Sequence, residues 1–290
     1  MWRRAGTAWW LALAFWSAAR SQPVEIPLED PKTDYAFLEF EPYPEFKSQS
    51  RLNENEARYW RVAGQLAFPA GHAFGHFLFG SFKNTLVNRD IDYHDTLLSG
   101  GILQRYWLSG GVLLLDAPRQ TSTFVAALAL NSDMADLGAR DWNGEWAWTY
   151  SFQQTPRFKW GLGLDVQYYF GKFVPYPLLF LDWRITDKTK LVWDADYAEI
   201  RRFLAPKLAL TAGGRFNTEF FALKRDATYE YQSGGAEAGL QYSLGNHSYV
   251  RLKYKELLWG RETFGLPDGS THTTAIHSGR SLRLNFAYGI

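Results

Sequence analysis

The sequence has no cysteine, and beyond its N-terminus it has no long apolar run. None of the 290 residues is Cys, which excludes a disulfide framework, a thiol nucleophile, a thiolate metal site and cysteine-linked lipid anchoring. No apolar run after residue 21 reaches the roughly 18 residues that a membrane helix needs. A Gly-Lys-Ser/Thr phosphate loop is also missing. These absences leave strands as the only route across a membrane.

The chain carries almost equal numbers of charges of each sign. It has 31 Lys and Arg against 30 Asp and Glu, for a formal charge of +1. Removing residues 1–21 takes away three arginines and no acid, which changes this charge from +1 to −2. Nucleic-acid binding needs a basic face, so we expect no nucleic-acid partner.

The first residues have the pattern of a secretory signal. Arg3 and Arg4 precede an apolar core at 8–15, and small residues at 17 and 19, or at 19 and 21, offer a cleavage site. The apolar core is too short to cross a bilayer. We therefore predict a signal peptide over residues 1–21 and export of the mature chain.

Residues 157–170 alternate between apolar and polar with a period of two. Phe158, Trp160, Leu162, Leu164, Val166, Tyr168 and Phe170 form the apolar set. Arg157, Lys159, Gly161, Gly163, Asp165, Gln167 and Tyr169 form the polar set. Successive side chains of a strand point to opposite faces, so this stretch predicts a strand with one apolar and one wet face.

The alternation alone does not say which face is inside. A soluble barrel would bury the apolar face, whereas a membrane barrel turns it to lipid and lines its lumen with the polar face. Aromatic residues stand at both ends of the apolar set and aliphatic ones between them, as expected for two lipid–water interfaces. The strand is also longer than the usual soluble strand of about 5–6 residues. Both features favour a membrane barrel.

The same alternation recurs to the C-terminus, with turns between the strands. We predict an all-β fold, a transmembrane antiparallel β-barrel over residues 57–290. It should have about twelve strands, or fourteen if residues 35–41 and a weak hairpin at 189–203 both contribute. An even number places both termini on the periplasmic side. Residues 22–56 are rich in Pro and acidic residues, and we predict a periplasmic segment or a plug there.

A resemblance to a known family adds to this prediction. The motifs that carry it are 162–164, Tyr168 with 170–171, the strand 179–183, the turn 187–188 and 212–214. Over residues 100–290 the chain resembles an uncharacterised family of bacterial outer-membrane barrels, a domain of unknown function. The last strand resembles the signal read by the barrel-assembly machinery, although Ile290 stands where an aromatic residue is usual. The resemblance implies the fold and an outer-membrane location, with lipid and lipopolysaccharide as partners, and implies no activity.

Charged side chains fall on the wet face of the predicted strands. As lumen-lining residues we predict Lys159, Asp165, Asp182, Arg184, Asp194, Arg215, Glu219, Glu237, Arg251 and Lys253, with Lys190 beside them. Buried charges are costly without partners, so they should pair across strands or face water. Two hypotheses follow: a salt-bridge lattice that fills a structural barrel, or a pore whose charges set solute preference.

Other functions have weaker support from the sequence. A lipid-modifying enzyme would need a nucleophile and base, for which His277-Ser278 and His94-Asp95 are the nearest pairs, but adjacent strand residues face opposite sides. A soluble lipid carrier would need its apolar faces inside. His72 and His76 would lie roughly 13 Å apart on a strand, too far for one metal, and we expect no cofactor. The sequence thus favours a channel or structural barrel over an enzyme.

Overall fold

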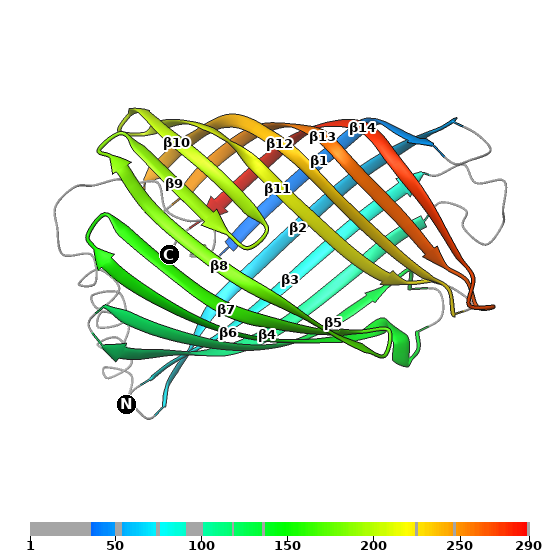
Figure 1. The fold of residues 1–290 in the computed structure, drawn as a ribbon, viewed down its shortest axis with the longest axis horizontal. Coiled ribbons are helices and arrows are strands. Elements are labelled where there is room, and N and C mark those ends of the chain that lie inside the picture. The colour runs from blue at the N-terminus through cyan, green and yellow to red at the C-terminus, as the bar shows by residue number, and fades with distance from the viewer. Residues whose placement is uncertain are drawn as a thin grey trace.

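The computed structural model is a closed barrel of antiparallel strands (Figure 1). It describes residues 36–49, 54–73, 76–90, 101–117, 119–134, 137–223, 226–245 and 248–288. The predicted signal peptide and its cleavage site lie outside these ranges. Within them, no helix is both long and apolar enough to cross a membrane.

Fourteen strands and one short 3₁₀ helix make up the described chain. The strands are β1 (Ala36–Gln49), β2 (Glu54–Ala73), β3 (His76–Asp90), β4 (Gly101–Ala117), β5 (Gln120–Ser132), β6 (Trp142–Thr155), β7 (Phe158–Tyr169), β8 (Lys172–Thr186), β9 (Thr189–Asp194), β10 (Tyr197–Ala205), β11 (Leu208–Ala222), β12 (Thr228–Gly245), β13 (Ser248–Gly265) and β14 (Thr271–Tyr288). The 3₁₀ helix η2 (Ala139–Asp141) precedes β6. The all-β prediction is confirmed, with the higher of the two strand numbers.

The barrel closes where β1 pairs with β14. Ala36 lies opposite Tyr288 and Phe40 opposite Leu284, while the other edge of β1 pairs with β2. The first and last strands are therefore neighbours, and β1 begins at the same end of the barrel at which β14 ends.

β1 lies inside the Pro-rich segment that we expected to be periplasmic or a plug. The barrel therefore begins at Ala36, well before the boundary that we drew at residue 57. Only Pro42 and Pro44 fall within β1, and its register shifts between Phe40 and Glu45 on one edge and between Tyr43 and Phe46 on the other. A proline has no N–H for the ladder, so the strand accommodates both where its pairing is irregular.

The apolar faces of the strands point outward. Along β14, Leu282, Leu284 and Phe286 are 42–50% exposed, whereas Ser281 and Arg283 are 3% exposed. On β7, Leu162 and Leu164 are exposed and Asp165 is buried. An apolar exterior around a polar interior is the arrangement of a barrel that sits in lipid. It is the opposite of what a soluble lipid carrier requires.

The wall is incomplete on one side. The hairpin of β9 and β10 is short, and β8 pairs with β9 only from Phe180 to Thr186. β11 in turn pairs with β10 only from Leu208 to Arg215. Among the described residues, therefore, no strand lies between the first half of β8 and the last half of β11.

Two prolines lie on the unpaired edge of β8. The carbonyl of Leu179 faces that edge, where it accepts a hydrogen bond from the Ala195 N–H at 3.1 Å. Backbone groups of alternate residues point to the same side of a strand, so Pro175 and Pro177 face the edge as well. Proline has no N–H. The unpaired edge of β8 therefore has fewer N–H groups that would lack a hydrogen-bond acceptor in lipid.

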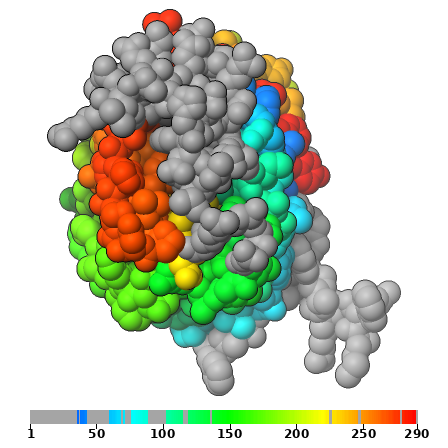
Figure 2. Space-filling model, turned by 90° about the vertical axis from the view of Figure 1, so that its right-hand side faces the viewer, coloured from blue at the N-terminus to red at the C-terminus, as the bar shows by residue number. Residues whose placement is uncertain are grey.

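The end of β11 stays paired with β12 as far as Ala222 and also contacts β5 and β7, which lie beyond the gap in the wall. Ala222 pairs with Ser132 of β5, and the Asp133 N–H donates to the Ala222 carbonyl at 3.2 Å. The Phe220 ring stacks on Tyr169 of β7, with centroids 3.9 Å apart. Seen from the end with the longer connections, atoms of this yellow segment lie in the middle of the face (Figure 2). β11 therefore contacts strands other than its two neighbours in the closed barrel.

Candidate functional site

The interior holds a lattice of buried ion pairs contributed by β1, β2 and β10 to β14. Arg283 connects two acids, with Nη2 2.9 Å from Glu41 Oε2 and Nη1 2.9 Å from Glu237 Oε1. Lys253 Nζ lies 3.1 Å from the other oxygen of Glu237 and also pairs with Glu199. Each of these five side chains is no more than 7% exposed.

The lattice continues along both sides of this centre. Arg201 Nε is 2.5 Å from Glu199 Oε1. On the other side Arg61 pairs with Glu39, and its Nε lies 3.1 Å from Glu219 Oε1. A cation on each side of a carboxylate gives its oxygens partners, which offsets the cost of burying the charge. These ion pairs link side chains from seven strands of the barrel wall.

The predicted lumen-lining residues occupy several environments. Asp165, Asp194, Glu219, Glu237, Arg251 and Lys253 are buried. Asp182, Arg184 and Arg215 are half-buried, and Lys159 is exposed near the tight-turn end of β7. The structure brings Glu237 and Lys253 into one ion pair at 3.1 Å, and Asp182 and Lys190 into another at 2.7 Å. Arg251 instead donates to Gln241 Oε1, from Nε at 2.9 Å and Nη2 at 2.6 Å.

Several lattice members were absent from our predicted set. Glu39 and Glu41 were assigned to the segment before the barrel, and Glu199, Arg201 and Arg283 were not singled out. A signal was present in the sequence, because Glu39 and Glu41 alternate with Leu38 and Phe40 as strand residues do. The density of prolines concealed it.

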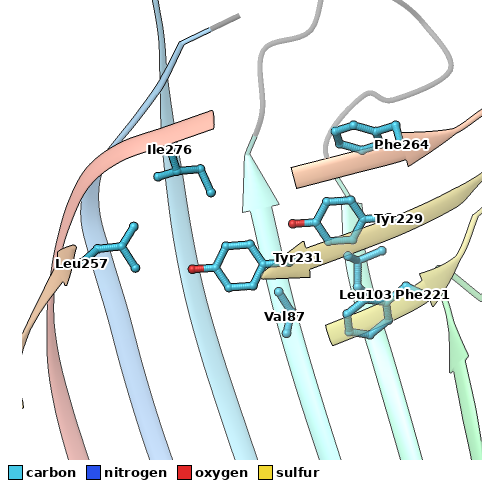
Figure 3. Close-up of a cluster of buried hydrophobic side chains, with 8 residues drawn as sticks. All are labelled: Val87, Leu103, Phe221, Tyr229, Tyr231, Leu257, Phe264 and Ile276. Atoms are coloured by element: carbon cyan, nitrogen blue, oxygen red, sulfur yellow. The ribbon is translucent and has the colours of Figure 1, made fainter. Parts of the chain in front are cut away.

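A cluster of apolar side chains occupies the interior at the end with the longer connections. It consists of Val87, Leu103, Phe221, Tyr229, Tyr231, Leu257, Phe264 and Ile276, each no more than 7% exposed (Figure 3). Val87 and Leu103 come from β3 and β4, whereas the others come from β11 to β14. β3 and β11 are far from neighbours in the sheet, so the contact crosses the lumen. The cluster therefore constricts the barrel at this end.

Most of the residues considered for metal binding or catalysis lie outside the side chains that the structure describes. No group of three or more His, Asp or Glu side chains in the described ranges could hold a metal ion. His94 lies outside the described residues. His277 belongs to β14, but its side chain is not described.

Comparisons with known proteins return structures only. No family model matches the sequence, and a search of curated proteins finds no match. The Pseudomonas putida toluene transporter TodX superposes with a TM-score of 0.44 at 9% identity, over 94% of this chain and 93% of that one. An outer membrane channel from Pseudomonas putida F1 gives 0.46 at 9%, over 90% and 100%. The NanC porin gives 0.40 at 8%, over 87% and 100%.

Likeness at this level says nothing of what this chain binds or transports. The class of protein follows instead from the chain's own geometry, a closed antiparallel barrel with an apolar exterior and a charged interior. The resemblance to an uncharacterised barrel family over residues 100–290 stays an expectation at the level of the family.

Proposed function

We propose that this chain is an outer-membrane barrel that conducts small solutes through a narrow, gated lumen. The observation that carries the proposal is the division between the two faces of the wall. Leucines and aromatics face outward, while charged side chains meet inside. A wall with these two faces suits lipid outside and water inside.

Two constrictions in series would restrict the path. Near the middle, the lattice around Arg283 and Lys253 presents both charge signs within a few ångström. Interleaved charges of this kind give little preference between anions and cations. At the end of the barrel with the longer connections, the apolar cluster around Phe221 and Tyr231 narrows the lumen. An apolar constriction can close a pore by excluding water. Small uncharged polar solutes would meet the lowest electrostatic barrier.

A structural barrel without transport is the second candidate, since buried ion pairs fill part of the interior. Conductance in planar bilayers separates the two. The wild-type protein should give small, weakly ion-selective currents, and Phe221→Ala should enlarge them because it removes a ring from the constriction. Phe216→Ala, on the same strand but 60% exposed, is the matched control and should leave the currents unchanged.

Currents indistinguishable from those of the bare bilayer in the wild type and in Phe221→Ala would reject the conduit and favour the structural barrel. Folding of each variant is checked by its mobility on a gel before and after boiling, because a folded barrel migrates differently from its unfolded form. Fractionation with outer membranes tests the proposed location in the same preparations.

A further inference from the structure

An arginine on β10 faces outward among apolar side chains. Ile200, Arg202 and Leu204 are all exposed on this strand, and the two apolar ones are 48% and 55% exposed. Arg201, which precedes Arg202, is fully buried inside the barrel. Alternate side chains share one face of a strand, so Arg202 lies on the face that meets lipid in a membrane barrel. A cation on that face is costly unless it reaches the interface or an anion.

The neighbours of Arg202 engage only part of its guanidinium group. Thr189 lies directly opposite on β9, and Leu210 lies opposite on β11. Arg202 Nη1 donates to Thr189 Oγ1 at 2.8 Å, and no carboxylate among the described residues forms an ion pair with Arg202. The planar fork of N–H donors of a guanidinium group matches the oxygens of a phosphate. The remaining donors of Arg202 are therefore available to such an anion.

Two lysines of adjacent hairpin turns add positive charge beside Arg202. Lys188 lies in the β8–β9 turn and Lys207 in the β10–β11 turn, and both are exposed. The Lys188 carbonyl accepts a hydrogen bond from the backbone of β10 at 2.8 Å, which places this turn next to Arg202. Asp187, the acid of these two turns, pairs instead with Arg157 of the β6–β7 turn at 2.8 Å. The outer surface here has an excess of positive charge.

The position of these turns along the barrel indicates what they meet. They belong to the end with the short hairpins, which lies on the periplasmic side of outer-membrane barrels. Trp183 and Phe158 lie on the same side of the barrel, with their rings edge to face and centroids 6.2 Å apart. Trp183 is 42% exposed, as expected of an aromatic side chain at a lipid–water interface. Headgroups of lipids in the periplasmic leaflet lie at this depth.

We propose that the outer surface formed by Arg202, Lys188 and Lys207 binds the headgroup of an anionic phospholipid. The guanidinium group binds the phosphate, and the two lysines favour a headgroup with net negative charge over a zwitterionic one. Ile200 and Leu210, 48% and 45% exposed, offer apolar surface to the acyl chains.

The surface rests on the proposed location in an outer membrane and is independent of conduction. Lipid binding in a barrel that passes no current would overturn the conduit and leave the lipid site standing. Currents in a barrel without lipid preference would overturn the lipid site alone.

The test is native mass spectrometry of the folded full chain, released from non-ionic detergent micelles. The micelles contain equal amounts of phosphatidylglycerol and phosphatidylcholine with identical acyl chains. We expect the wild-type barrel to retain at least about fivefold more phosphatidylglycerol, the preference that a single cation beside a lipid surface provides. Equal retention of the two lipids overturns the proposal.

Paired variants locate the site. Arg202→Gln with Lys188→Gln should reduce the preference to less than about twofold. Arg261→Gln is the matched control, because Arg261 is an exposed arginine of β13 near the opposite end of the barrel and donates to Gln232 at 2.7 Å. Gln232 donates in turn to Glu230 at 2.5 Å, and this acid disfavours an anionic lipid there. The control should stay within about twofold of the wild type.

Folding of each variant is checked by gel mobility. If the double variant fails to fold, Lys188→Gln alone takes its place and should lower the preference at least about twofold. A folded variant with the wild-type preference, or an equal loss in Arg261→Gln, overturns the assignment.

An acidic segment of the same chain, residues 22–35, is the competing occupant of a cationic surface at this end. Replacing its four acidic residues with the corresponding amides should leave retention of phosphatidylglycerol unchanged. A severalfold rise in retention would mean that the segment covers the surface, and would overturn the lipid assignment.

Discussion

Arg283 and Glu41 meet inside the barrel across the seam where its last strand joins its first. Arg283 Nη2 on β14 lies 2.9 Å from Glu41 Oε2 on β1, and Ser281 donates to the same carboxylate at 3.0 Å. These contacts join residues more than two hundred positions apart and supplement the backbone ladder that closes the sheet.

Replacing Arg283 should weaken this closure. Arg283→Met leaves Glu41 and Glu237 buried with fewer cations, and the loss of one partner of a buried ion pair costs roughly 3–5 kcal/mol. The measurement is the free energy of unfolding in urea with lipid vesicles. Arg280→Met is the matched control: it lies on the same strand and breaks an exposed pair with Glu256 at 3.4 Å. Equal stability of the two variants would contradict a structural role for the lattice.

A glycine on the inner face of β7 permits close strand packing. A Cβ added at Gly163 would lie 2.3 Å from the Trp148 carbonyl oxygen, which belongs to the adjacent backbone and cannot move freely. Gly163→Ala should therefore lower the unfolding free energy by about 1–3 kcal/mol, as overpacking does. At Gly110 the nearest atom to an added Cβ is 3.8 Å away, so Gly110→Ala should be tolerated. Comparable losses at both positions would refute the steric explanation.

The outward direction of the apolar face predicts a difference between two lysine substitutions on β7. Leu162→Lys places a charge on the exterior, at a cost of about 2–4 kcal/mol near the middle of the bilayer. Gln167→Lys points inward, where its neighbour Asp165 already accepts a hydrogen bond from Gln167 at 2.7 Å, and it should cost far less. Folding yield into vesicles measures both. A greater loss for Gln167→Lys would mean that the faces are inverted.

The prolines of β8 should prevent pairing at its open edge. Pro175→Val with Pro177→Val restores two N–H groups that face the edge, and an edge with free donors and acceptors is a template for another chain. We expect a larger oligomeric fraction by light scattering in detergent. Tyr176→Val, between the two prolines, is the control and should have the same oligomeric fraction as the wild type. An unchanged mass for the double variant would show that something else protects the edge.

Much of the barrel was predictable because strand alternation is a local property. Leu282, Leu284 and Phe286 alternate with Ser281 and Arg283 in the sequence, and the structure exposes and buries them in the same order. The prediction was weaker where local signals conflict. Prolines in β1 argued against a strand, although pairing with β2 and β14 on both edges maintains it.

The sequence by itself determined the strands, their turns and the two faces of the wall, since each depends on residues a few positions apart. The tertiary structure decided which charges pair, because Glu41 and Arg283 meet only after the sheet has closed. It also decided that the end of β11 would contact β5 and β7. No periodicity reports such a contact, because it follows from the short β9–β10 hairpin and from rings that stack across the gap in the wall.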